Sequence, residues 1–307
     1  MAKSCMELCE QKWAEEKFVC VGLDTSFEQL PEHIRNAKGS IGAKIKNFNS
    51  EIILATRDIA SAYKYNFGFY LGVHRLWALE ESIRFSQTAA PDVPIILDWK
   101  AGDIGSTLRE YARYAFEEMG VDAVTVNPWG GKADGIDVFF EYRDKLIFVW
   151  CAGSNRGSAE IQDLMTGNRY EKMRIFESLA RKASVSARDG WNYNQNCGLV
   201  VGADSSDHYC ISIYEARSQS GRVPFLIPGI GKQGGDLYQA VTSAIYMDPE
   251  SKDTSFPAII NSSRSIIYAS SGLDFAEAAR EKTGDLNIRI LSALEDIGCG
   301  IYEKRHP

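Results

Sequence analysis

Eight short apolar runs, separated by segments of helical pattern, constrain the fold of this chain more than any other feature. Several runs are rich in valine and isoleucine with few polar interruptions, as strands buried on both faces of a parallel sheet are. Parallel neighbours need a crossover between them, and most intervening segments have room for one helix, for example 107–119 and 235–247. The predicted strands are 18–24, 61–66, 93–98, 122–127, 145–151, 197–202, 223–228 and 257–261.

Eight strand–helix units are what a TIM barrel requires, so we expect an α/β fold with residues 1–307 forming a single (β/α)8-barrel domain. A doubly wound open sheet has the same alternation, and periodicity alone does not distinguish the two. The longest irregular stretch, at about 154–196, reads as an insertion or long loop after the fifth strand. It contains a predicted helix over 170–188, and long loops of this kind often bind or cover ligands.

Charge and cysteine usage narrow the class of protein. A formal net charge of −7 disfavours a nucleic-acid partner. The first 18 residues read as a charged amphipathic helix rather than a signal peptide, and no apolar run is long enough for a membrane span. The odd number and irregular spacing of the cysteines predict free thiols in a cytoplasmic protein, without disulfides or zinc. They are Cys5, Cys9, Cys20, Cys151, Cys197, Cys210 and Cys299.

Charged residues gather where the third predicted strand ends. Asp98 closes this strand, Lys100 follows two residues later, and Asp103 lies in the loop that leads to the next helix. If the extended backbone persists, Asp98 and Lys100 point the same way, into the mouth of the barrel where active sites lie. The alternative is structural: Asp103 as a helix cap and Asp98–Lys100 as an ordinary ion pair.

Two other strands also carry polar residues toward their ends. Lys64 and Asn66 share one face of the second strand, and burial of a lysine there would require an accompanying anion. The alternative for Lys64 is an exposed lysine on an edge strand. Asp24 ends the first strand, where a turn aspartate is common.

The seventh and eighth strands run into segments suited to phosphate. Residues 228–236 form a glycine-rich turn whose backbone N–H groups are free to bind an anion. Residues 261–265 offer Arg264 and several hydroxyls. Barrels frequently bind phosphate at these two loops, although a pair of ordinary tight turns is the alternative.

The histidines form no cluster with ligand spacing, and we expect no metal site and no Ser–His nucleophile. No pattern for an organic cofactor is visible, so none is expected. The four histidines are His33, His74, His208 and His306.

Taken together, these motifs resemble the orotidine 5′-phosphate decarboxylase family in its longer form. The run 98–107 resembles the Asp-x-Lys-x-x-Asp-Ile signature, and the segments 64–70, 228–236 and 261–269 resemble further parts of the family in the same order. The resemblance spans about residues 19–269. It implies decarboxylation of orotidine 5′-phosphate to UMP in de novo pyrimidine biosynthesis, without a cofactor.

The resemblance also implies roles for individual residues. Lys64, Asp98, Lys100 and Asp103 would form a charged tetrad, with Lys100 protonating C6 of the pyrimidine. The neighbouring subunit would contribute Asp103, Ile104 and Thr107, which implies a homodimer with shared active sites. The implied substrate contacts are Gln233 and Arg264 for phosphate, Asp24, Asn66 and Thr107 around the ribose, and Ser154 for the pyrimidine amide.

Two rival functions remain open from the sequence. One is a related barrel enzyme that decarboxylates a sugar-acid phosphate with Mg²⁺, which usually has an acidic metal ligand in place of Lys64. The other is a non-catalytic nucleotide-binding barrel, which has no need of clustered charges.

Overall fold

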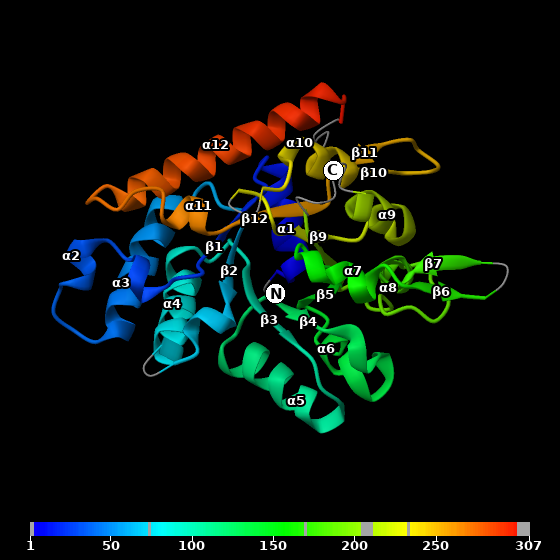
Figure 1. The fold of residues 1–307 in the computed structure, drawn as a ribbon, viewed down its shortest axis with the longest axis horizontal. Coiled ribbons are helices and arrows are strands. Elements are labelled where there is room, and N and C mark those ends of the chain that lie inside the picture. The colour runs from blue at the N-terminus through cyan, green and yellow to red at the C-terminus, as the bar shows by residue number, and fades with distance from the viewer. Residues whose placement is uncertain (1–2, 73–74, 169–170, 204–210, 232–233, 300–307) are drawn as a thin grey trace.

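The computed structural model describes residues 3–72, 75–168, 171–203, 211–231 and 234–299 (Figure 1). Eight parallel strands close into a barrel in the order β1-β12-β9-β8-β5-β4-β3-β2. The strands are β1 (Val19–Gly22), β2 (Ala62–Asn66), β3 (Ile95–Ala101), β4 (Ala123–Val126), β5 (Leu146–Ala152), β8 (Cys197–Val201), β9 (Phe225–Ile227) and β12 (Ala258–Ser262).

Closure confirms the predicted TIM barrel and excludes the open sheet. The first strand pairs with β2 on one side and with the last barrel strand, β12, on the other, in the register Val19↔Ile260. A closed sheet has no edges, so strands are covered on both faces. All five residues of β8, for example, are buried, which accounts for their unbroken apolar pattern.

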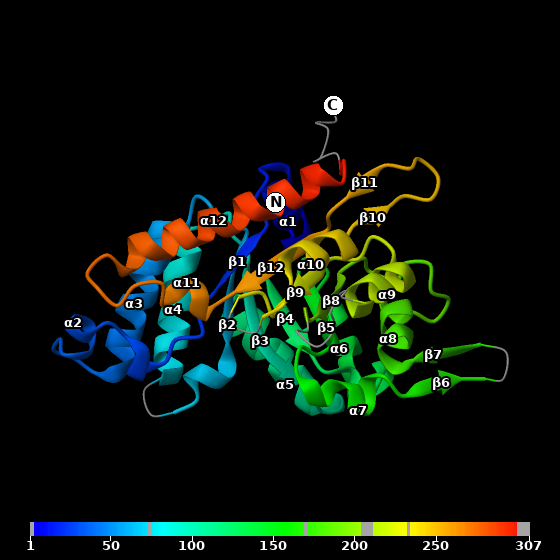
Figure 2. The same ribbon diagram turned by 45° about the horizontal axis from the view of Figure 1, so that its top comes forward.

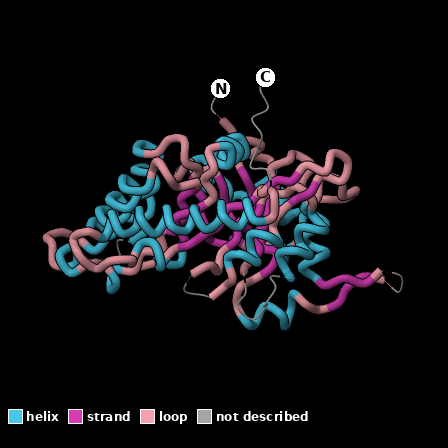
Figure 3. Tube along the Cα trace, turned by 90° about the horizontal axis from the view of Figure 1, so that it is seen from above, coloured by secondary structure: helices cyan, strands magenta, loops and turns pink. Residues whose placement is uncertain are grey.

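Helices surround the barrel, and Figures 2 and 3 show the strands in the middle of the molecule. Neighbouring helices pack side by side, with α3 between α4 and α12, and α8 against α9. The longer helices are α1 (Cys5–Ala14), α3 (Ile41–Thr56), α4 (Arg75–Ala89), α5 (Gly105–Arg113), α8 (Ile175–Ala183), α9 (Ile211–Ser220), α10 (Leu237–Ser243) and α12 (Phe275–Asp296). The short ones are α2 (Glu32–Arg35), α6 (Asp137–Phe140), α7 (Ala159–Gln162) and α11 (Arg264–Ile267).

Helix α1 lies at the end of the barrel where the strands begin, opposite the candidate site. Ser4 caps it in a capping box with Glu7, and the Cys5 N–H donates to Asp144 O, two residues before β5. Its buried Lys12 pairs with Asp92, just ahead of β3. The predicted N-terminal amphipathic helix is therefore confirmed.

Two predicted helices are shorter than the sequence pattern suggested. The helix expected over 235–247 ends at Ser243, because β10 (Tyr246–Met247) pairs with β11 (Thr254–Ser255). The helix expected over 170–188 begins only at Ile175, because β7 (Lys172–Arg174) pairs with β6 (Met165–Gly167), and it ends at Ala183, where Ser184 takes an extended backbone. In both cases cross-strand pairing, which local periodicity does not reveal, takes residues from the helix.

The stretch 154–196 after β5 has two parts. Helix α8 packs against β5 and α9 and so belongs to the layer around the barrel. The β6–β7 hairpin extends away from the barrel (Figure 2). The helix expected over 107–119 forms as α5, followed by a π-helical turn over Tyr114–Glu118.

The cysteines of the described residues are free and buried: Cys5, Cys9, Cys20, Cys151, Cys197 and Cys299. Cys210 lies outside the described residues. None of the helices in the described part of the chain combines the length and apolar character that a bilayer crossing requires.

Candidate active site

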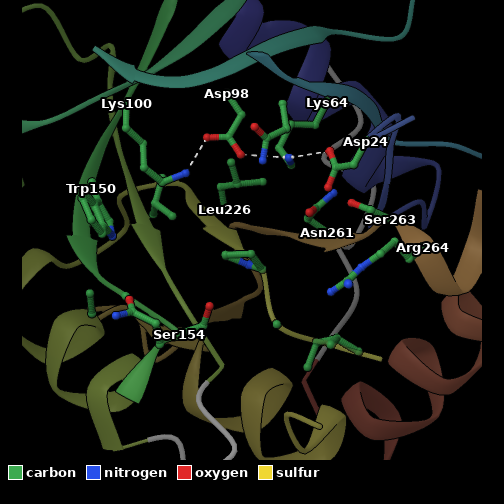
Figure 4. Close-up of a pocket in the computed structure, with 18 of the residues that line it drawn as sticks. Asp24, Lys64, Asp98, Lys100, Trp150, Ser154, Leu226, Asn261, Ser263 and Arg264 are labelled. Atoms are coloured by element: carbon green, nitrogen blue, oxygen red, sulfur yellow. Dashed lines mark hydrogen bonds and ion pairs between the residues drawn. The ribbon is translucent and has the colours of Figure 1, made fainter. Parts of the chain in front are cut away.

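A cavity of about 210 Å³ opens where the barrel strands end, and polar side chains from three of the strands and from the segments that follow strands line it (Figure 4). Apolar side chains of β5, β8 and β9 complete its wall. Lining residues that bear on the chemistry are Asp24, Lys64, Asn66, Asp98, Lys100, Trp150, Ser154, Val200, Leu226, Asn261, Ser263 and Arg264.

Four charged side chains form a row of alternating sign along one side of this cavity (Figure 4). Lys64 Nζ lies 2.9 Å from Asp98 Oδ2 and 3.4 Å from Asp24 Oδ1. Lys100 Nζ lies 2.7 Å from Asp98 Oδ1. The Lys64 side chain is only 3% exposed, so the alternative of an exposed edge lysine is wrong.

The barrel register brings these residues together. Gly22 of β1 pairs with Lys64 of β2, and Asn66 of β2 pairs with Asp98 of β3, so the polar ends of three strands are adjacent. Parallel strands all end at the same rim of a barrel. Charges that are far apart in the sequence therefore meet at that rim.

The row keeps its buried members ionised. Burial alone would raise the pKa of Asp98, but the nearby ammonium groups of Lys64 and Lys100 more than offset this, and the pKa lies well below its usual range. Burial alone would lower the pKa of Lys64, but the carboxylates of Asp24 and Asp98 hold it well above its usual range. Both groups are therefore charged at neutral pH.

The backbone that carries Lys100 is not extended, contrary to the expectation from alternation. Lys100 has a φ of +47°, and the pairing of β3 with β4 shifts from Leu97↔Val124 to Ala101↔Val126. Asp98 and Lys100 nevertheless meet, because this bulge turns the lysine back over the carboxylate.

Thr125, in the middle of β4, contacts this bulge and was not identified from the sequence. Its hydroxyl donates to Asp98 Oδ1 at 2.9 Å. Thr125 Oγ1 itself accepts hydrogen bonds from the N–H groups of Trp99 and Lys100, at 3.0 and 2.9 Å. A threonine inside an apolar run was the available signal, but β-branched threonine is common in strands for packing reasons alone.

Trp150 of β5 is a second lining residue that was not predicted. Its ring centroid lies 5.9 Å from Lys100 Nζ, on the other side of the ammonium from Asp98 (Figure 4). With Val200 and Leu226 it forms an apolar wall beside the charged row. Lys100 is thus held between a carboxylate and an aromatic face, both favourable for a cation.

Asp103, Ile104 and Thr107 do not line the cavity of this chain. All three are exposed: Asp103 and Ile104 lie just before α5, and Thr107 lies in its first turn. Helix α5 begins after Ile104 without a side-chain cap, so the alternative of Asp103 as a helix cap is not supported. The Asp103 carboxylate instead accepts the neighbouring N–H of Ile104 at 2.7 Å.

The loops after β9 and β12 lie across the cavity from the charged row. Gly229 and Gly231 have φ values of +107° and +102°, which favour glycine. A Cβ at Gly229 would lie 2.4 Å from Ala203 O, so the backbone can approach closely here. Arg264 reaches the cavity from the start of α11 (Figure 4). Gln233, the other predicted phosphate ligand, lies outside the described residues.

Asn66, at the end of β2, and Ser154, just after β5, also line the cavity. Asn66 Oδ1 accepts the Gly68 N–H at 3.1 Å, which starts the short helical turn after β2. Ser154 packs closely on the end of β8, where a Cβ at Gly202 would lie 2.7 Å from the serine nitrogen. This close packing anchors the loop after β5.

His33 is the one histidine among the described residues. His33 lies against Phe275, with ring centroids 6.0 Å apart, and does not line the cavity. His74, His208 and His306 lie outside the described residues. No group of three His, Cys, Asp or Glu side chains that could hold a metal ion occurs among residues that the structure describes.

Comparison with known proteins gives consistent results over most of the chain. Residues 18–281 match the model of the orotidine 5′-phosphate decarboxylase / HUMPS family. An orotidine 5′-phosphate decarboxylase of Herpetosiphon aurantiacus is 41% identical over 266 residues, covering 86% of this chain and 88% of that protein. One from Cellvibrio japonicus is 38% identical, covering 90% of this chain and 94% of that protein.

Solved structures of related proteins share the fold. The OMP decarboxylase of Leishmania donovani superposes with a TM-score of 0.72 at 31% identity, covering 94% of this chain and 99% of that chain. The UMP synthase of the same organism gives a TM-score of 0.76 at 31% identity, and the match covers 95% of this chain but 56% of that longer chain.

Proposed function

Because the chain belongs to the orotidine 5′-phosphate decarboxylase / HUMPS family, we propose that its cavity decarboxylates orotidine 5′-phosphate to UMP in pyrimidine biosynthesis. The row of Asp24, Lys64, Asp98 and Lys100 is the observation that carries this proposal. A nucleotide-binding barrel without catalysis has no need of four alternating charges, two of them almost fully buried, beside its ligand. We further propose a single catalytic domain in a cytoplasmic protein.

The proposed reaction requires stabilisation of charge at one carbon. Loss of CO2 from C6 leaves the electron pair of the broken C–C bond in the plane of the pyrimidine ring, where the ring does not delocalise it. An ammonium group at this position stabilises the developing charge and supplies the proton that completes UMP. Fixed charge placed where charge develops is usually the largest catalytic contribution.

Lys100 is the residue we assign to this role. Its side chain is 32% exposed, so it reaches the cavity, whereas that of Lys64 is 3% exposed. Asp98 and the ring of Trp150 hold the ammonium from two sides, at 2.7 Å and 5.9 Å. Lys64, paired with both carboxylates, would hold them in place. After proton transfer, Lys100 regains its proton from solvent.

Arg264 and the loop after β9 are assigned to the phosphate, across the cavity from the charged row. The Arg264→Ala variant is expected to lower kcat/KM for orotidine 5′-phosphate by about 10- to 100-fold, as the loss of a charge-assisted hydrogen bond implies. Steady-state kinetics checks this. Arg84→Ala, which removes an exposed arginine of α4 paired with Glu81, is the control and should leave kcat/KM unchanged. Equal kcat/KM in both variants would count against the phosphate role.

A homodimer with shared active sites is part of the proposal. Asp103 lies outside the cavity of its own chain, and two large apolar side chains are exposed near it. Ile104 is 65% exposed, and Trp129, beside the nearby Gly130, is 77% exposed. Covering this surface with a second copy would bury both side chains and bring Asp103, Ile104 and Thr107 toward the partner's cavity.

Mixed dimers test this arrangement. Lys100→Ala and Asp103→Ala proteins, each nearly inactive alone, are expected to regain roughly a quarter of the wild-type activity after equal mixing and subunit exchange. The reason is that half of the dimers are hybrids, each with one site that carries both changes and one that carries neither. Activity is measured before and after exchange. A mixture that stays inactive although hybrids form would contradict shared sites.

The proposed function itself is tested by following the loss of orotidine 5′-phosphate absorbance with purified protein and EDTA. Conversion to UMP in EDTA supports the assignment. Absence of conversion by folded protein, followed by turnover of a sugar-acid phosphate with Mg²⁺, would instead favour the metal-dependent rival. Lys64 disfavours that rival. Its ammonium lies between Asp24 and Asp98, at the position that a metal ion bound by these two carboxylates would have to take.

A further inference from the structure

Thr125 lies behind the charged row, within hydrogen-bonding distance of two of the groups that the proposed reaction uses. It is fully buried in β4 and does not line the cavity, so it cannot touch a substrate there. Any effect on the reaction therefore has to act through its neighbours. The hydroxyl makes three contacts: it donates to Asp98 Oδ1 and accepts from the N–H groups of Trp99 and Lys100.

These contacts use the full hydrogen-bonding capacity of a hydroxyl, which is one donor and two acceptor positions. Between Leu97↔Val124 and Ala101↔Val126, three residues of β3 face the single residue Thr125 of β4. Such a bulge leaves N–H groups without a strand partner. The threonine oxygen takes the place of the missing backbone acceptor, and this stabilises the bulge.

The bulge places Lys100 in a backbone conformation that lysine rarely adopts. Its φ of +47° is unfavourable for any residue with a Cβ and persists only where neighbouring contacts enforce it. The Lys100 N–H to Thr125 Oγ1 bond, at 2.9 Å, is one such contact.

Thr125 also orients the carboxylate between the two lysines. Asp98 Oδ1 receives both the Thr125 hydroxyl and Lys100 Nζ, at 2.9 and 2.7 Å. The other oxygen, Oδ2, is left to Lys64 at 2.9 Å. One side chain thus fixes the carboxylate that holds Lys100 and the backbone from which Lys100 extends.

We propose that Thr125 is a positioning residue that sets the Lys100 ammonium at the reacting carbon. The inference rests on the proposed function, because it assumes that Lys100 acts on C6 of a pyrimidine nucleotide. Thr125 matters most to the step in which charge develops at C6 and little to the binding of UMP, which carries no charge there. This separates a positioning role from a purely structural one.

The test compares Thr125→Val, which keeps the shape and removes the hydroxyl, with Thr125→Ser, which restores it. In Thr125→Val, kcat should fall by about 10- to 100-fold with KM within about threefold, because a hydrogen bond to a charged group and two backbone contacts are lost. Thr125→Ser should recover kcat to within about threefold of wild type. Thr125→Cys, close in volume but a weak hydrogen-bonding partner, serves the same purpose if the valine protein aggregates.

A binding measurement gives a readout that reduced stability would not change. The probe is 6-hydroxyuridine 5′-phosphate, whose ionised oxygen is bonded to C6 and so places negative charge next to the carbon where charge develops in the reaction. Its Kd should rise by about 10- to 100-fold in Thr125→Val, while the Kd of UMP stays within about threefold. Thr283→Val is the matched control: this buried threonine of α12 donates to Ala279 O at 2.8 Å, does not line the cavity, and should leave kcat and both Kd values unchanged.

Two outcomes are distinguishable. If wild-type protein does not decarboxylate orotidine 5′-phosphate, the proposed function is overturned and this inference with it. If wild type turns over and folded Thr125→Val keeps its kcat and its affinity for the C6 oxyanion, only the positioning role of Thr125 is overturned.

Discussion

Replacing Lys100 with alanine is expected to lower kcat by about a thousandfold or more, at or above the upper end of the roughly 100- to 1000-fold loss caused by removing one preorganised group that stabilises developing charge. The variant loses both the cation beside C6 and the proton donor. Binding of UMP should change by less than about tenfold, because the phosphate side of the cavity is untouched. Single-turnover kinetics and calorimetric titration with UMP provide the two measurements.

Lys17→Ala is a matched control for this experiment. The Lys17 side chain is 25% exposed and its Nζ lies 2.7 Å from Glu15, against 32% and 2.7 Å for Lys100 and Asp98. It lies just after α1, at the opposite end of the barrel, so its removal should leave kcat unchanged. Wild-type turnover by a folded Lys100→Ala protein would rule out the proposed mechanism.

Among the variants proposed for this protein, Lys64→Met should show the largest loss in the free energy of unfolding. The lysine ammonium is almost fully buried between Asp24 and Asp98, and removal leaves the Asp98 carboxylate, 8% exposed, with Lys100 as its remaining cation. Breaking a buried ion pair from one side costs about 3–5 kcal/mol. Urea denaturation measures the loss in the free energy of unfolding, and we expect kcat to fall as well because Asp98 no longer holds its position.

The loss of unfolding free energy in Lys64→Met should depend on pH, and the direction follows from the pKa values of the two wild-type groups. In wild type the pKa of Asp98 is depressed, so its contribution to stability is complete above about pH 4 and is lost as pH falls through the lower folded-state value. The pKa of Lys64 is raised, so its contribution is complete below about pH 10 and is lost as pH rises through the higher folded-state value. Between these limits the pair's contribution is constant.

Without Lys64 the pKa of Asp98 rises, and protonation relieves the poorly compensated buried charge. The difference in unfolding free energy between variant and wild type should therefore shrink as pH falls from 7.5 toward 5. A difference that is small at pH 7.5, or that grows toward pH 5, would contradict this account of the charged row.

Lys12→Met is the matched control, because Lys12 is equally buried but its partners are not. The side chains of Asp92 and Glu15 are 53% and 35% exposed, so both carboxylates are rehydrated when the lysine is removed. We expect a cost of about 1 kcal/mol or less, little dependence on pH, and unchanged kcat. Comparing the two variants shows how much of the lost stability comes from removing a buried lysine and how much from leaving its carboxylate partners buried.

The strands and the chemistry of their ends were predictable from the sequence because both are local properties. An unbroken apolar run such as 197–202 predicts a strand buried on both faces, and polar residues that follow such runs are predicted to lie at the rim. Lys64 was predictable as buried and paired because a lysine inside an apolar strand needs an anion. The lengths of the helices predicted over 235–247 and 170–188 were overestimated. Some of their residues form β10 and β7 instead, and strand pairing with β11 and β6 is not visible in the periodicity of the sequence.

Local pattern therefore determined which residues form strands and which polar groups reach the rim. Tertiary structure alone decided how these groups meet. Closure of β1 on β12 removed the sheet edges, and the register of β2 with β1 and β3 placed Lys64 between two carboxylates. The left-handed backbone of Lys100 depends on a hydroxyl from the neighbouring strand, Thr125. Periodicity reports which face a side chain takes, whereas a hydrogen-bond partner on another strand depends on register, which only the folded barrel establishes.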